Sequence, residues 1–167
     1  MYDNAIQTSA SYVPDALRVH HATLHFTPAV RHGDQLYCSG ILGLGADGMP
    51  ISDPEIQFIQ IFAAIQNLLS MAGASLVDIL EATSYHVDMQ QHWQTFRQVK
   101  EQYIAAPFSA WTAIGTSELA LPGALAEVRV LARIPNKSRL PFAAPEGRKF
   151  FPALESQPLS PAQAGTE

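Results

Sequence analysis

The sequence is poor in three features that mark common classes of protein. It has a single cysteine, Cys38, among 167 residues, which excludes an internal disulfide and is typical of a reducing compartment. It contains no run of lysine and arginine, and its formal net charge is −5, which disfavours a nucleic-acid-binding surface. It also lacks an apolar run of the roughly 18–20 residues that a membrane-spanning helix needs. We therefore expect a cytoplasmic protein that binds neither nucleic acid nor membrane.

What is present indicates one globular domain with two extensions. Hydrophobic residues make up 47% of the chain and charged residues only 15%, which leaves apolar surface for contact with partner subunits. Residues 1–22 are small and polar, and we expect an N-terminal extension there. Residues 135–167 hold six of the 12 prolines and form a predicted C-terminal extension. Its aromatic residues should dock part of it, residues 140–154, onto the body or a neighbouring subunit.

Between the extensions, in residues 23–134, the pattern predicts the element order β-β-α-β-α-β-β. The first two strands should form a hairpin that turns at Gly33, a residue that tolerates a positive φ. Residues 40–52 contain four glycines and are expected to form a loop. The predicted strands cover residues 24–30, 35–39, 79–87, 110–115 and 124–134.

Two helices are predicted from apolar spacing and capping residues. The first begins at Asp53-Pro54, carries apolar residues at i, i+3 and i+4, and stops at Gly73. The second is capped by Asp88 and ends at Pro107. Two amphipathic helices fit one face of a mostly antiparallel sheet, so the fold class is α+β. The other face must then be covered, and oligomerisation is the obvious means.

Several short motifs recur in a familiar order over residues 26–134. They are Gly33-Asp34, Ser39-Gly40, Asp47-Gly48, the segment from Met71 to Met89, Ala110-x-Thr112, Leu121-Pro122 and Glu127. Together they resemble the Rid family, also called the YjgF-like family. The resemblance implies a chorismate-mutase-like fold and a homotrimer whose sheets form a central barrel. It also implies clefts between subunits that bind a small-molecule ligand.

The resemblance further implies a site whose usual chemistry is altered. Active members hydrolyse imines and enamines such as 2-aminoacrylate, and an arginine in the strand over residues 110–115 holds the substrate carboxylate. Trp111 occupies that position here, and an indole cannot bind a carboxylate by charge. Phe26 matches a tyrosine, Ile41 a glutamine and Ala113 a residue that is often cysteine. The residues expected to bind substrate are Phe26, Ser39, Gly40, Ile41, Trp111, Thr112 and Ala113.

Glu127 is the one catalytic residue that the resemblance retains. It matches the acidic residue that positions the hydrolytic water, and a carboxyl group in an apolar cleft suits a general acid or base. The alternative is an outward-facing residue paired with Arg129 or Arg133.

The other positions leave alternatives open. Trp111 either stacks on a ligand or packs at an interface. Ser39 either contacts the ligand or simply ends a strand, and Arg31 or Arg129 can replace the missing arginine by reaching from a neighbouring strand.

The remaining candidates favour structural roles. The cluster formed by His20, His21 and His25 lacks an established zinc spacing, so we expect surface histidines and no metal. Cys38 has no partner base and is expected to be an inert buried thiol. No cofactor is predicted.

The function predicted from the sequence is hydrolysis of an imine or enamine, with a specificity altered by Trp111. The alternative is a non-catalytic trimer that binds a small molecule in an apolar cleft between subunits. A ribonuclease activity is disfavoured by the acidic balance of charge.

Overall fold

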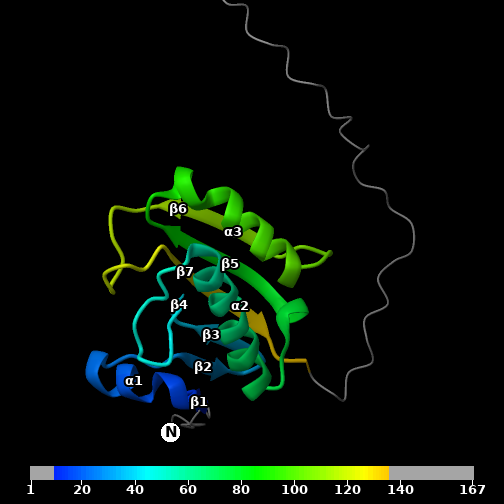
Figure 1. Cartoon of the computed structure of the whole chain (residues 1–167). Helices are drawn as coiled ribbons and strands as arrows, with labels where there is room; N and C mark the ends of the chain where they lie inside the picture. Colours follow the sequence, from blue (N-terminus) through cyan, green and yellow to red (C-terminus); the bar gives the residue numbers. More distant parts are fainter. Residues whose placement is uncertain (1–9, 136–167) are drawn as a thin grey trace, which may run out of the picture. The chain divides into compact units, whose positions relative to one another are not determined.

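The computed structural model describes residues 10–135, which form three helices and a seven-stranded mixed sheet (Figure 1). The strand order is β1-β2-β3-β7-β5-β6, and β4 pairs with β7 beside β3. All pairings are antiparallel except β5 with β6, which α3 connects. The strands are β1 (Ala10–Tyr12), β2 (Ala29–His32), β3 (Gln35–Cys38), β4 (Ile41–Leu42), β5 (Ile79–His86), β6 (Ala110–Gly115) and β7 (Ala126–Arg133).

Helices α2 (Pro54–Met71) and α3 (Met89–Tyr103) lie on one face of the sheet (Figure 1). The start of α2 follows the prediction, because the Asp53 carboxylate accepts a hydrogen bond from the Ile56 amide at 2.9 Å. The helix stops before Gly73, whose φ is +78°. The core lies between this helical layer and the sheet, and its largest apolar side chains are Phe58, Phe62, Phe96, Leu36, Ile61, Ile65, Leu68 and Leu69.

The predicted hairpin is present, but its first strand was placed too early. Gly33 turns the chain with φ +64°, and the strand before it begins at Ala29. Residues 15–24 are helical instead, in a 3₁₀ turn η1 (Asp15–Leu17) and helix α1 (Arg18–Leu24). An ion pair between Arg18 and Asp15 (2.7 Å) supports this segment, and the left-handed conformation of His25 ends it.

The N-terminal extension is part of the sheet where the structure describes it. Strand β1 pairs with β2 and forms one edge of the sheet. Tyr12 and Leu17 pack against the hydrophobic core. The segment over residues 140–154, for which docking was predicted, lies outside the described residues.

Three smaller differences follow from local geometry. Asp88 makes no side-chain cap; it adopts a left-handed conformation, and its carbonyl accepts the first helical hydrogen bonds of α3. The helix ends at Tyr103, before Pro107. Ile41 and Leu42, predicted to lie in a loop, form β4 because they pair with the start of β7.

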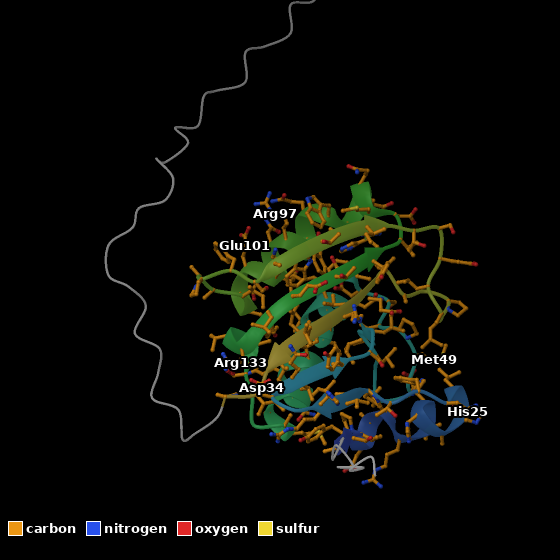
Figure 2. The ribbon with its side chains drawn as sticks, turned by 180° about the vertical axis from the view of Figure 1, so that it is seen from behind. His25, Asp34, Met49, Arg97, Glu101 and Arg133 are labelled. Atoms are coloured by element: carbon orange, nitrogen blue, oxygen red, sulfur yellow. The ribbon has the colours of Figure 1, made fainter. Side chains whose placement is uncertain are left out.

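No helix among residues 10–135 covers the face of the sheet opposite α2 and α3. Viewed from behind, the strands lie in front of these helices (Figure 2). Side chains on this face include Tyr37 and Ile114, which are 38% and 40% exposed. None of the helices in the described part of the chain is long and apolar enough to cross a membrane.

Candidate functional site

A cavity of about 590 Å³ lies beside the beginning of β7. Its walls come from the η1–α1 segment, from β4 and the loop that follows it, and from α2. Among residues 10–135, most of the lining side chains are apolar, and none belongs to a lysine or an arginine. The polar side chains that line it belong to His20, Ser39, Gln60, Asn67 and Glu127.

Five of the eight predicted site residues meet in this cavity: Phe26, Ser39, Gly40, Ile41 and Glu127. They are separated by up to about a hundred positions in sequence and come together because β3, β4 and β7 are neighbours in the sheet. The cavity therefore has an apolar lining with one carboxyl group.

Glu127 is placed by strand pairing and by a glycine. Its partner across β4 is Leu42, and its carboxyl group lies directly over Gly40. A Cβ atom at Gly40 would be 1.8 Å from the Glu127 Oε1 atom, so a larger residue there would displace the carboxyl group. Burial raises the pKa of Glu127, which favours the protonated form relative to an exposed glutamate. A carboxyl group whose pKa is raised in this way gives up its proton less readily than an exposed glutamate and is suited to proton transfer.

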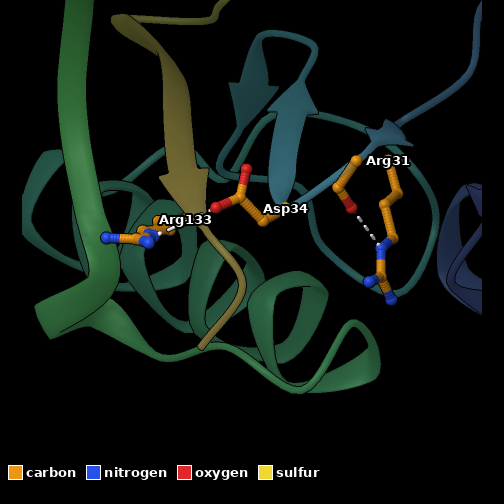
Figure 3. A network of polar contacts seen from close by, with 4 residues as sticks. Arg31, Asp34 and Arg133 are labelled. Atoms are coloured by element: carbon orange, nitrogen blue, oxygen red, sulfur yellow. Dashed lines mark hydrogen bonds and ion pairs between the residues drawn. The ribbon is translucent and has the colours of Figure 1, made fainter. Parts of the chain in front are cut away.

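Two arginines that the sequence offered as neighbours of this site, Arg31 and Arg133, make contacts elsewhere (Figure 3). Arg133 Nε lies 3.2 Å from Asp34 Oδ2, and Arg31 Nε donates a hydrogen bond to the Gly33 carbonyl at 2.8 Å. Neither Arg31 nor Arg129 lines the cavity. Between residues 10 and 135, no cation lies within ion-pair distance of Glu127.

Backbone contacts hold the other lining residues in place. The Ser39 hydroxyl donates to the Thr27 carbonyl at 2.8 Å, and the Ser39 amide donates to the Pro28 carbonyl at 2.9 Å. The carbonyl of Phe26 is bound by the His21 Nδ1 atom. The Ser39 hydroxyl is thus committed to the fold, although the residue lines the cavity.

Trp111 does not line the cavity and packs under α3 instead. Its Nε1 atom donates to the Ser84 hydroxyl at 2.9 Å, and its ring lies 6.3 Å and 6.4 Å from the rings of Phe62 and Phe96. The Lys100 ammonium is 4.5 Å from the centre of the Trp111 ring. Within the single chain the indole is a packing residue of the core.

Strand register explains this separation. Trp111 pairs with Ala82, and Ala82 pairs with the buried Val130 on β7. Glu127 is three positions from Val130, so its side chain leaves the opposite face of the strand. Thr112 shares the face of Glu127 but lies on the edge strand β6, and Ala113 shares the face of Trp111. These three residues are not among those that line the cavity.

The sequence analysis missed the contribution of α1 and α2 to the cavity. On α2 the lining residues Gln60, Ala63, Ala64 and Asn67 follow i, i+3, i+4, i+7 spacing, the signature of one helix face. That spacing can be seen in the sequence. The buried stripe of α2 is more apolar, however, and it was the only face of this helix used in the prediction. The two alanines leave room for a ligand between the two amide side chains.

Two further predictions concern reactive side chains. Cys38 is buried, and burial raises the pKa of its thiol to about 12, so the nucleophilic thiolate is suppressed. In the described region, no three His, Cys, Asp or Glu side chains are grouped so as to hold a metal ion. His20, His21 and His25 lie on one segment but do not converge on a common point.

Comparison with known proteins gives a consistent result. Residues 4–134 match the family model described as endoribonuclease L-PSP. The chain is 35% identical over 118 residues to the RutC family protein YjgH of Escherichia coli (strain K12), which covers 70% of this chain and 88% of that protein.

Solved structures agree in fold. A structure of protein YjgH has a TM-score of 0.66 at 35% identity, covering 70% of this chain and 89% of that one. A Mycobacterium tuberculosis member of the YjgF/YER057c/UK114 family has a TM-score of 0.66 at 21% identity, covering 76% and 100%. RidA from the Antarctic bacterium Psychrobacter sp. PAMC 21119 has a TM-score of 0.61 at 24% identity, covering 65% and 88%.

Proposed function

This chain belongs to the Rid family, also called the YjgF-like or endoribonuclease L-PSP family, and on that premise we propose that it hydrolyses a small, uncharged imine or enamine. The observation that carries the proposal is the carboxyl group of Glu127 in an otherwise apolar cavity. Its raised pKa supports a role in proton transfer. The substrate class follows from the lining, which offers hydrogen bonds and apolar contact but no cation.

The proposed reaction adds water across a C=N bond. The Glu127 carboxyl group donates its proton to the imine nitrogen, and the resulting carboxylate accepts a proton from the attacking water. A C–O bond forms, giving a carbinolamine. Glu127 then gives its regained proton to the nitrogen and takes the hydroxyl proton of the carbinolamine. The carbon–nitrogen bond breaks as the C=O bond forms, and the products are a carbonyl compound and an amine. Each proton removed from water is returned to the leaving nitrogen, so Glu127 ends in its starting state.

The same lining disfavours an α-imino acid as the substrate. A substrate carboxylate would enter a cavity with no guanidinium to receive it, near a second carboxyl group. The sequence attributes this change in specificity to Trp111, but Trp111 does not line the cavity, so we attribute the change to the lining itself. The lack of lysine and arginine in the lining also disfavours an RNA backbone as the ligand.

We further propose that the active form is a homotrimer. The support is the uncovered face of the sheet, with Tyr37 and Ile114 partly exposed on it (Figure 2). The edge strand β6, which carries Thr112, has β5 as its one strand partner among residues 10–135, so its outer edge can meet a neighbouring subunit. A trimer of this 18.2 kDa chain is expected in light scattering.

The test compares the hydrolysis of benzaldimine, a neutral primary aromatic imine, with that of 2-aminoacrylate. The wild type should accelerate only the first reaction. Glu127→Gln keeps the shape of the side chain but cannot transfer a proton, so kcat should fall by about 10²–10⁴-fold. Glu118→Gln, at an exposed glutamate away from the cavity lining, is the matched control and should behave as wild type. Wild-type turnover in Glu127→Gln would remove Glu127 from the mechanism.

The second candidate is a non-catalytic small-molecule-binding protein. It is favoured by the predominance of apolar side chains around a single ionisable carboxyl group. If neither imine is hydrolysed and the cavity still binds a neutral aromatic molecule, this second function replaces the first.

A further inference from the structure

His20 occupies a position on the cavity wall that its two neighbouring histidines do not share. It lies on α1 and lines the cavity together with Leu17 and Leu24 of the η1–α1 segment. Its ring rests against the turn at Gly48, where a Cβ atom would be 2.9 Å from the His20 Cε1 atom. Gly48 also has φ +77°, so a residue with a side chain is disfavoured there on two grounds. The His20 imidazole therefore packs against this turn.

The Nδ1 atom of His20 is buried and has no hydrogen-bond partner among the described residues. Leaving a buried polar atom unpaired costs about 1–3 kcal/mol, and native proteins rarely do so without a reason. The adjacent His21 shows the ordinary alternative, because its Nδ1 atom is bonded to the Phe26 carbonyl. His25 is exposed, at the outer end of α1 (Figure 2). Only His20 combines a cavity position with an unpaired ring nitrogen.

We propose that His20 is a ligand-binding residue, whose Nδ1 atom accepts a hydrogen bond from an N–H or O–H group of the molecule in the cavity. A neutral imidazole that carries its proton on Nε2 offers Nδ1 as an acceptor. Because Nδ1 is buried in the chain without a ligand, the ring must rotate so that this nitrogen faces the ligand; the bond then removes the cost of the unpaired atom. This inference rests on the cavity being the ligand site of the proposed function, but it does not depend on the reaction.

The two polar anchors then lie on different walls of the cavity. Glu127 is held by β7 over Gly40, and His20 is held by α1 over Gly48. The ligand class is an uncharged molecule with an apolar body and a hydrogen-bond donor directed at α1. Primary imines and enamines carry such a donor on nitrogen. The N-terminal segment is thereby a determinant of specificity, because it supplies His20 together with apolar wall residues.

The test measures binding of N-phenyl-1-naphthylamine, a neutral fluorescent probe with a single N–H donor, to the full-length protein. His20→Phe keeps an aromatic ring against the turn at Gly48 but removes both ring nitrogens. It should weaken probe binding by about two- to tenfold, the range for one neutral hydrogen bond. His20→Gln restores an acceptor and should recover part of the affinity. The matched control is His25→Phe, on the same segment, which should bind as wild type.

A second ligand separates hydrogen bonding from packing. 1-Benzylnaphthalene has a methylene group in place of the N–H group, and its affinity is obtained by displacing the probe. His20→Phe should not weaken its binding, so the loss seen with the probe is specific to the donor. Equal losses for both ligands, unchanged probe binding in His20→Phe, or failure of the wild type to bind the probe would each overturn the inference. The proposed reaction is scored separately, by turnover in Glu127→Gln.

Discussion

Two regions of the molecule treat their polar atoms differently. One is the aromatic cluster under α3, formed by Phe62, His86, Trp93, Phe96 and Trp111. The other is the cavity that contains Glu127. In the aromatic cluster, the Ser84 hydroxyl bonds both the Trp111 Nε1 atom and, at 2.8 Å, the His86 Nε2 atom.

In the cavity, by contrast, the described residues provide no ion-pair partner for Glu127 and no hydrogen-bond partner for the His20 Nδ1 atom. Polar groups that are satisfied within the chain hold the fold together, and those that are not are available to a ligand. We therefore expect the aromatic cluster to stabilise the fold and the cavity to bind and act on a ligand.

The largest expected effect tests this division at Trp111. Trp111→Ala removes the indole from between Phe62, Phe96 and Lys100, and it should lower the free energy of unfolding by about 3–5 kcal/mol. Trp111→Phe keeps most of the packing and loses the bond to Ser84, so it should cost about 1 kcal/mol. Both values come from urea denaturation.

The same Trp111 variants should bind the fluorescent probe as the wild type does, at a temperature where they are folded. If Trp111→Ala kept its stability and lost probe binding, the indole would be a ligand contact and the division would be wrong. If Trp111→Ala lost both stability and probe binding, the two regions would belong to one site. A cleft that is completed by a neighbouring subunit would give this result.

The second prediction concerns the buried His86, which is 1% exposed. Burial lowers the pKa of His86 from 6.5 to about 4, because the charged form is poorly solvated in the aromatic cluster. The unfolded chain binds a proton at higher pH than the folded chain does. Stability is therefore complete above pH 6.5 and is lost as the pH falls toward 4, by about 3 kcal/mol.

The control for this pH effect is His86→Phe, which keeps an aromatic ring but cannot titrate. As the pH falls from 7 to 4, the wild type should lose unfolding free energy that the variant keeps. The value for the wild type minus the value for the variant should therefore fall. A constant difference over this range would show that His86 is not the group responsible.

Much of the fold followed from local sequence signals. The Asp53 cap, the stops at Gly33 and Gly73, and the bounds of β6 are all encoded within a few residues, and the structure confirms them. The segment 15–24 was misplaced because its short helix lacks a strong apolar stripe and none of the residues of α1 is buried. Several of its residues line the cavity, and a local sequence pattern cannot show which segments meet there.

The candidate site was predictable only in part, for a reason of strand geometry. Matching Glu127, Gly40 and Phe26 to the family motifs identified residues that do meet. Motif matching also placed Trp111 with them, but successive residues along a strand point to opposite faces, so a shift of one residue decides the side on which a side chain points. No motif pointed to His20, and its place on the cavity wall and its unpaired Nδ1 atom are visible only in the structure.

The smallest predicted effect has the opposite sign and lies in the cavity. Burial raises the pKa of Glu127 above its unfolded value, so ionisation is less favourable in the folded chain. The wild type should therefore lose a little stability as the pH rises through the folded pKa. Glu127→Gln cannot ionise, and its Tm should exceed that of the wild type by about 1–3 °C at pH 7, with no excess at pH 4. Calorimetry at both pH values checks this, and a lower Tm at pH 7 would mean that the carboxylate has a stabilising partner in the assembled protein. The residue proposed for catalysis would then be part of the stabilising network, and the contrast between the two regions would fail at its central residue.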